Sequence, residues 1–238
     1  MSLRIPALLL AFLFASLVDA AETDALRAVV PAGAGVYFET QDLSGARDEF
    51  VNSAFFERLR AFPPLKTWRR KNALSLQIIS GQLAQRIGVE IEDLGRQVFG
   101  GNAALAVWPP KTSDPENVPW LLVVQARDAE LLKKAVAGLN DATRQGKEFV
   151  SIREAAHADV GYHVRVLNRS GKESTEYLAA AGTFGFLTNQ ESLLKTALEL
   201  KSSPARAEGR LLGNARFREA MSRNPSGQAA RLFVDPRA

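Results

Sequence analysis

Two apolar stretches decide the fold of this 238-residue chain: residues 103–108, Ala-Ala-Leu-Ala-Val-Trp, and residues 120–124, Trp-Leu-Leu-Val-Val. Gly100-Gly101 precedes the first stretch, and a proline-containing loop separates it from the second. Neither stretch alternates with polar residues, and a strand that is apolar on both faces is typically buried on both. The sequence therefore predicts two central strands that pair as antiparallel neighbours. The large side chains expected in the core of the sheet are Leu105, Val107, Leu122 and Val124.

Shorter patterns place further strands after this pair. Apolar and polar residues alternate at 150–153 and again at 162–166, which is typical of strands with one wet face. Gly182-Thr183 separates two apolar segments by two residues, a spacing that fits a tight hairpin turn. Before the central pair, residues 36–39 follow the turn signal Pro31-Ala32-Gly33 and predict the first strand.

Helices are expected between these strands. Apolar residues recur at helical spacing in 50–62 and in 65–87. A short third helix is expected at 91–99. Asp128 can cap a fourth helix, while Thr188 and Glu191 form a capping-box pattern that opens a fifth. The order of elements after Trp120 favours an α+β fold, with a mainly antiparallel sheet and helices packed on one side.

The C-terminal segment repeats features of the first strand. Pro225-Ser226-Gly227 precedes 232–235 much as Pro31-Ala32-Gly33 precedes 37–39. We therefore divide the mature chain into an α+β domain, 21–224, and a C-terminal strand, 225–238. Two alternatives stay open: this strand begins a truncated second repeated unit, or it adds to an exposed sheet edge of the first domain. Docking is favoured because Ala230, Leu232 and Val234 form an apolar face.

The first twenty residues have the layout of a signal peptide. Arg4 precedes an apolar run, 5–18, and the small residues near Ala20 fit cleavage ahead of Ala21. A helix of about 14 residues reaches only about 21 Å, short of the ~30 Å core of a bilayer, so no stable membrane span is expected in the mature chain. The chain has no cysteine, which excludes disulfides, thiolate metal sites and cysteine nucleophiles. We expect an exported protein, periplasmic or extracellular, of a bacterial envelope.

The charge of the chain does not favour nucleic-acid binding. Thirty Lys and Arg against 26 Asp and Glu give a net charge of only +4. The densest basic cluster is Arg69-Arg70-Lys71, with Lys66 and Trp68 nearby. We interpret this cluster as the solvated face of a helix, with Trp68 turned toward the core.

Several of these landmarks together resemble a family of exported bacterial proteins that is classed only as a domain of unknown function. The resemblance rests on the signal peptide, the Pro-Ala-Gly turn into residues 36–39, the segment from Gly88 to Pro110 and residues 186–189 before a leucine-rich helix. The family has no established activity or site to carry over. Its members are typically longer, with repeated α+β units, whereas this sequence ends soon after its second turn signal.

Few residues point to chemistry. The only histidines, His157 and His163, are six residues apart across an expected hairpin, with Glu154 and Asp159 nearby. Imidazole and carboxylate groups together suit several transition metals, so a weak metal site is one interpretation and two solvated surface imidazoles are the other. No nucleophile elbow, phosphate-binding loop or dinucleotide fingerprint is present.

Two hypotheses follow for the function. The favoured one is a non-catalytic binding or scaffolding module whose partner is another envelope component, with no catalytic, cofactor or metal residues. The alternative is a hydrolase or metalloenzyme that uses the His157/His163 region. The two hypotheses differ in whether both histidines and a carboxylate converge at metal-ligand distance.

Overall fold

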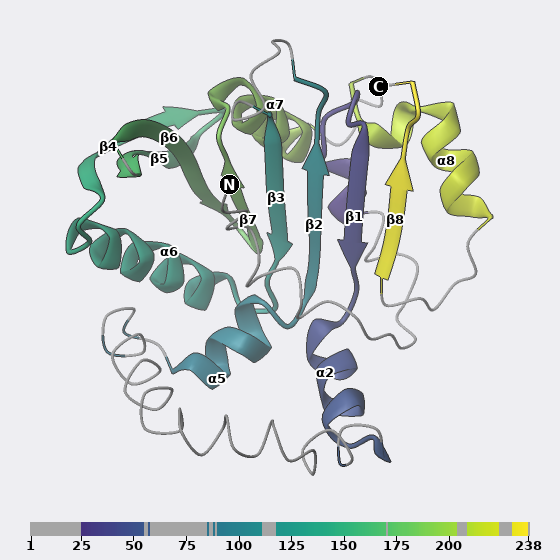
Figure 1. The fold of residues 1–238 in the computed structure, drawn as a ribbon, viewed down its shortest axis with the longest axis horizontal. Helices are drawn as coiled ribbons and strands as arrows, with labels where there is room; N and C mark the ends of the chain where they lie inside the picture. The colour runs from purple at the N-terminus through teal and green to yellow at the C-terminus, as the bar shows by residue number, and fades with distance from the viewer. Residues whose placement is uncertain are drawn as a thin grey trace.

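The computed structural model describes residues 25–54, 57, 85, 88, 90–110, 118–169, 171–203, 209–223 and 230–237. These residues contain one open sheet of eight antiparallel strands, in the order β4-β5-β6-β7-β3-β2-β1-β8 (Figure 1). The strands are Val36–Thr40 (β1), Asn102–Val107 (β2), Trp120–Gln125 (β3), Phe149–His157 (β4), Val160–Arg169 (β5), Lys172–Ala181 (β6), Phe184–Thr188 (β7) and Ala230–Val234 (β8). The expected α+β class and mainly antiparallel sheet are confirmed.

Helices connect and cover the strands. They are Leu43–Val51 (α2), Ile91–Asp93 (α5), Ala129–Arg144 (α6), Glu191–Ser202 (α7) and Ala215–Ser222 (α8), with a π-helical segment at Leu94–Val98 (η2) and a 3-10 turn at Leu211–Gly213 (η3). No helix of the described residues is long and apolar enough to cross a membrane. The expected signal segment, the basic cluster at 66–71, more than half of the stripe at 50–62 and nearly all of the stripe at 65–87 lie outside the described residues.

The central strand pair forms as the sequence predicts. Leu105 of β2 lies opposite Leu122 of β3, and Val107 lies opposite Trp120. β1 pairs with the free side of β2, and β7 pairs with the free side of β3. β1 and β7 therefore flank the central pair, with β8 beyond β1 and with β6, β5 and β4 beyond β7.

The face of this pair that is fully buried is not the expected one. The side chains buried to 1% exposure or less are the alternate set, Ala104, Ala106, Leu121 and Val123. Leu105, Val107, Leu122 and Val124 are only half-buried. The sequence could not separate the two faces, because both are apolar and burial depends on which face the distant helices cover.

Helices cover both faces of the sheet, so the expectation that they pack on one side needs correction. The main core joins one face to α7 and α8 through Leu194, Leu198 and Phe217. A second, smaller core joins the opposite face to η2 and α6, where Val98 and Leu132 pack with Leu178 of β6. Residues 178 and 179 are neighbours in one strand, and their side chains enter different cores because strand side chains alternate between faces.

The C-terminal strand docks on the edge of the sheet. β8 runs antiparallel to β1, with Val234 opposite Val36 and Ala230 opposite Thr40. The apolar face expected to dock is the exposed one, since Leu232 and Val234 are 60% and 55% exposed. The buried set is instead the alternate one: Phe233 packs edge-on against Phe217, and Arg231 turns into a polar network described below.

Local sequence signals predict some chain turns and not others. Gly101 is required where the chain enters β2, because a Cβ atom there would lie 2.1 Å from the carbonyl oxygen of Gln125. Gly182 has a positive φ of 60° in the expected turn between β6 and β7. Asp128 caps α6 as expected, accepting from the backbone nitrogens of residues 130 and 131. The expected capping box of Thr188 and Glu191 does not form.

The reason is that both members have other partners. The hydroxyl of Thr188 donates to the carbonyl oxygen of Trp120 at 2.5 Å, which ties β7 to β3. Glu191 accepts a hydrogen bond from the hydroxyl of Tyr162 at 2.5 Å. Gln190 occupies the N-cap position of α7 without a side-chain cap. Tertiary contacts therefore determine the start of this helix.

Candidate functional site

The two histidines lie on opposite faces of the β4–β5 hairpin. Its two-residue turn is Ala158-Asp159, with positive φ angles of 50° and 60°, so that His157 pairs with Val160. His163 is three residues beyond Val160, and an odd step along a strand leads to the other face. The two rings therefore cannot bind one metal ion together.

Each ring has its own surroundings. His157 Nε2 lies 2.7 Å from Oε1 of Glu199 and so connects the hairpin to α7. His163 is opposite Glu154 in β4, on the face that meets α6. Burial lowers the pKa of His163, with Arg144 and Arg165 adding to the effect and Glu154 opposing it. His157 thus lies where α7 contacts the sheet, and His163 lies on the face of the sheet that meets α6.

Acidic side chains do not complete a metal site in the part of the chain that the structure describes. No group of three or more His, Asp or Glu residues there could hold a metal ion. Asp159 belongs to the hairpin turn, beyond His157. Glu92, at the start of the α5–η2 helix, forms an exposed ion pair with Arg96 at 3.6 Å.

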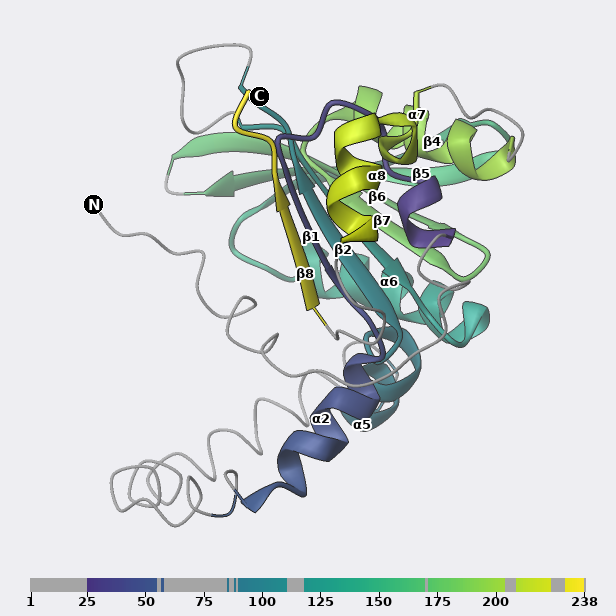
Figure 2. The same ribbon diagram turned by 90° about the vertical axis from the view of Figure 1, so that its right-hand side faces the viewer.

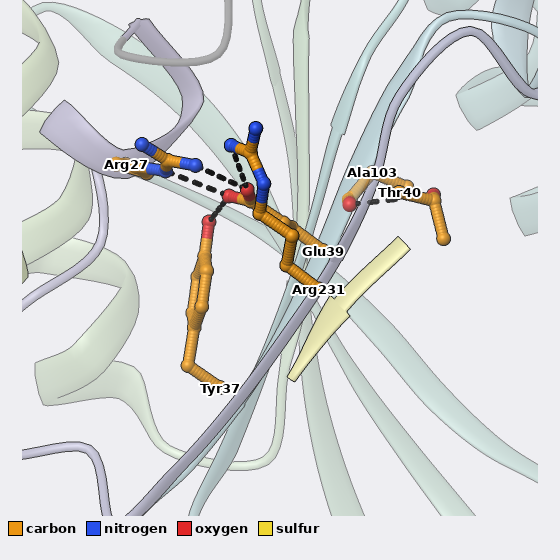
Figure 3. A network of polar contacts seen from close by, with 6 residues as sticks. All are labelled: Arg27, Tyr37, Glu39, Thr40, Ala103 and Arg231. Atoms are coloured by element: carbon orange, nitrogen blue, oxygen red, sulfur yellow. Dashed lines mark hydrogen bonds and ion pairs between the residues drawn. The ribbon is translucent and has the colours of Figure 1, made fainter. Parts of the chain in front are cut away.

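A buried polar network that the sequence analysis missed lies at the edge of the sheet, where β8 joins β1 (Figure 3). Its centre is Glu39, whose side chain is fully buried. Arg27 forms a two-pronged ion pair with this carboxylate, with Nε at 2.8 Å from Oε2 and Nη2 in close contact with Oε1. Arg231 of β8 adds Nη1 at 3.3 Å from Oε1, and the hydroxyl of Tyr37 donates to Oε2 at 2.8 Å.

The network fastens three segments of the chain together. Arg27 comes from the helical turn at residues 25–28, Glu39 from β1 and Arg231 from β8. Both carboxylate oxygens of Glu39 accept two hydrogen bonds, so its capacity to accept is filled by the protein itself. Burial and the Glu39 carboxylate raise the pKa of Tyr37 well above its ordinary value. This arrangement suits a structural fastener.

One signal in the sequence could have pointed to this network. Glu39 follows Tyr37 by two residues in the first strand, on the face that the sheet buries. A carboxylate at such a position requires a partner, because an isolated buried charge is very costly. Its two arginine partners are 12 and 192 residues away, and no local pattern identifies them.

The most exposed apolar surface of the described sheet lies on the opposite face of the same strands. We define the outer face by Val36, Leu105, Val107, Leu122, Leu232 and Val234. The register places these side chains side by side: Val36 lies between Val107 and Val234, and Leu105 lies opposite Leu122. Val36, Leu232 and Val234 are 37%, 60% and 55% exposed.

The helices explain why this surface is exposed. Figure 2 shows α8 on one side of β8 and β1, and no described helix on the other side of these two strands. α6 packs against β4, β6 and β7, at the far end of the sheet. A contiguous apolar surface of this kind is unusual on a protein that binds nothing, since such patches typically mark interaction sites.

Fold and surface together define an α+β protein with an open antiparallel sheet, whose outer face is apolar at the β8 edge. Comparisons with protein-family models, with curated proteins and with solved structures found no match to this chain.

Proposed function

We propose that this protein is an exported component of the bacterial envelope that acts as a non-catalytic binding or scaffolding module, with the outer face as its docking surface. The observation that carries the proposal is the exposure of Leu232, Val234 and Val36 side by side on adjacent strands. The signal-peptide layout of residues 1–20 and the resemblance to exported bacterial proteins support the location. The absence of cysteine is consistent with it.

The alternative, a hydrolase or metalloenzyme centred on His157 and His163, loses its geometric support. It requires both rings to converge on one ion or substrate, whereas the hairpin register separates them by the thickness of the sheet. His157 is instead engaged with Glu199. No arrangement of the described residues favours this second function.

Site-directed photo-crosslinking tests the proposal. A photoreactive side chain is placed at Leu232 in the exported protein, and intact bacteria are irradiated. We expect a discrete crosslinked partner, because the probe would lie within the docking surface. The same preparation, analysed by mass spectrometry, is expected to show a chain that begins at Ala21.

A matched control uses an exposed apolar position away from the outer face. Val150 of β4 is 43% exposed and lies at the other edge of the sheet. A probe at Val150 should give no specific product. The same crosslinked band from both positions, or none from Leu232, would contradict the outer face as the docking surface.

A further inference from the structure

The contact between α6 and the sheet changes character along the helix. Its first half is apolar, and Leu132 and Val136 pack with Leu178 in the second core. Its second half is polar, because Asn140 and Thr143 face the sheet there. Asn140 is 2% exposed. We call this second half, together with the β5 residues beneath it, the polar seam.

Two charged or titratable residues of β5 form the sheet side of the polar seam. Arg165 is 5% exposed, and its Nη2 donates to the hydroxyl of Thr143 at 2.6 Å. His163 lies two residues earlier on the same face. Arg144, in the last turn of α6, is close enough to His163 to lower its pKa. The imidazole therefore lies within electrostatic range of two arginines.

Hydrogen bonding in the polar seam is incomplete. Among the described residues, the buried atoms Asn140 Oδ1, His163 Nδ1 and Arg165 Nε have no hydrogen-bond partner. Buried polar groups are normally paired, and each unpaired group weakens the contact that contains it. The second half of α6 is thus held less firmly than the first half, which packs through leucine and valine.

Each element that packs against His163 contributes a neighbouring side chain, charged or apolar. β4 contributes Glu154, directly opposite the ring, and β6 contributes Leu178 on the other side. α6 contributes Arg144, whose own carboxylate partner is Asp141 at 2.5 Å.

Along β5 itself the neighbour is Arg165. It faces Glu176 of β6 at 3.8 Å, and Glu176 also pairs with Arg169 at 2.7 Å. The carboxylate opposite Arg165 is thus already shared between two arginines. Protonation of His163 would add a third positive charge to Arg165 and Arg169, and the carboxylate directly opposite the ring is Glu154.

We propose that the polar seam is a pH-responsive contact, in which protonation of His163 releases the second half of α6 from β5. The direction follows first from the cost of burying a charged imidazolium, to which repulsion from the guanidinium groups of Arg144 and Arg165 adds and which Glu154 opposes. It is also the direction that linkage requires. A histidine with a lowered pKa binds fewer protons in the folded state, so its contribution to stability is complete above the unfolded pKa of about 6.5 and is lost as the pH falls below it.

Amide hydrogen exchange of the whole chain tests the inference between pH 7.5 and 5.5, the range in which a histidine side chain ordinarily gains its proton. Protection factors corrected for intrinsic exchange are compared for residues 136–144 of α6 and 194–201 of α7. We expect protection in α6 to fall by about threefold or more on acidification, while α7 is unchanged.

Three variants distinguish the polar seam from a general effect of acid. His163→Gln should abolish the pH dependence in α6, because glutamine cannot take up the proton. Arg144→Gln changes a side chain that is 49% exposed, so folding should be unaffected, and it should reduce the pH dependence. His157→Gln, on the opposite face, should leave it intact. Protection in α6 that does not change with pH, or that still falls in His163→Gln, would overturn the proposal.

Discussion

The two faces of the sheet are covered in different ways, although the central strands are equally apolar on both. On the inner face, α7, α8 and the turn at 25–28 form one continuous core from β8 to β5. On the other face, η2 and α6 form a smaller core over β6 and β7, and the outer face at β8, β1, β2 and β3 remains more exposed. Apolar sequence thus indicates that a strand is central, while the placement of helices determines which of its faces becomes core.

The two faces also differ in how their buried polar and charged groups are hydrogen-bonded. The inner face contains Glu39, which is fully buried and satisfied by Arg27, Arg231 and Tyr37. The α6 side contains Arg165 and Asn140, which are nearly as buried but keep unpaired atoms. A buried carboxylate with all of its acceptor positions filled holds the segments that reach it, whereas unpaired buried atoms weaken the contact between α6 and β5.

The largest effect is expected from breaking the inner network. Glu39→Gln keeps the shape of the side chain but removes the buried negative charge that the guanidinium groups of Arg27 and Arg231 share. The free energy of unfolding should fall by about 3–5 kcal/mol, measured by urea denaturation. Glu92→Gln, which removes an exposed ion pair with Arg96, should cost less than about 0.5 kcal/mol. Equal losses in the two variants would mean that the buried network at Glu39 stabilises the fold no more than an exposed ion pair does.

A pair of adjacent leucines compares the two faces within one strand. Leu121→Ala removes a fully buried side chain from the inner face, and the free energy of unfolding should fall by about 2–5 kcal/mol. Leu122→Ala removes a half-buried one from the outer face and should cost about 1 kcal/mol, since less apolar area leaves contact. Urea denaturation of both variants checks the difference. A larger loss for Leu122→Ala would reverse the assignment of the faces.

The smallest effect is expected at the exposed edge. Leu232→Thr replaces a side chain that is 60% exposed with one that favours strands, so stability should change by less than about 0.5 kcal/mol. Thermal unfolding of the purified protein measures it. A loss above about 1 kcal/mol would show that the outer face is covered within the folded chain.

Sequence reasoning was successful where the information is local. The strand pair at 103–108 and 120–124, the turn at Gly182 and the cap at Asp128 depend on neighbouring residues, and the structure contains each of them. The docking of β8 was also favoured, although the expected face was wrong. Phe233 is buried because it packs against Phe217 of α8. The alternation of residues 230–235 does not indicate where that helix lies.

Features that depend on distant residues could not be predicted. The histidines are six residues apart, and an even separation within a single strand would place both side chains on one face. His157 instead pairs with Val160 across a two-residue turn, so these two residues share a face, and His163, three residues after Val160, lies on the other face. The partners of Glu39 lie at opposite ends of the described chain. The outer face is likewise visible only when the helices have been placed.

The ion pair between Arg231 and Glu39 joins residues 192 positions apart, and this separation has a consequence for the folding rate. Contacts between remote parts of a chain form slowly, because a long loop must close before the contact can contribute any stability. During synthesis β1 emerges early, whereas β8, which covers its free edge, emerges almost two hundred residues later. The sheet of the described residues can therefore be completed only after β8 has been made, and until then the edge of β1 stays uncovered.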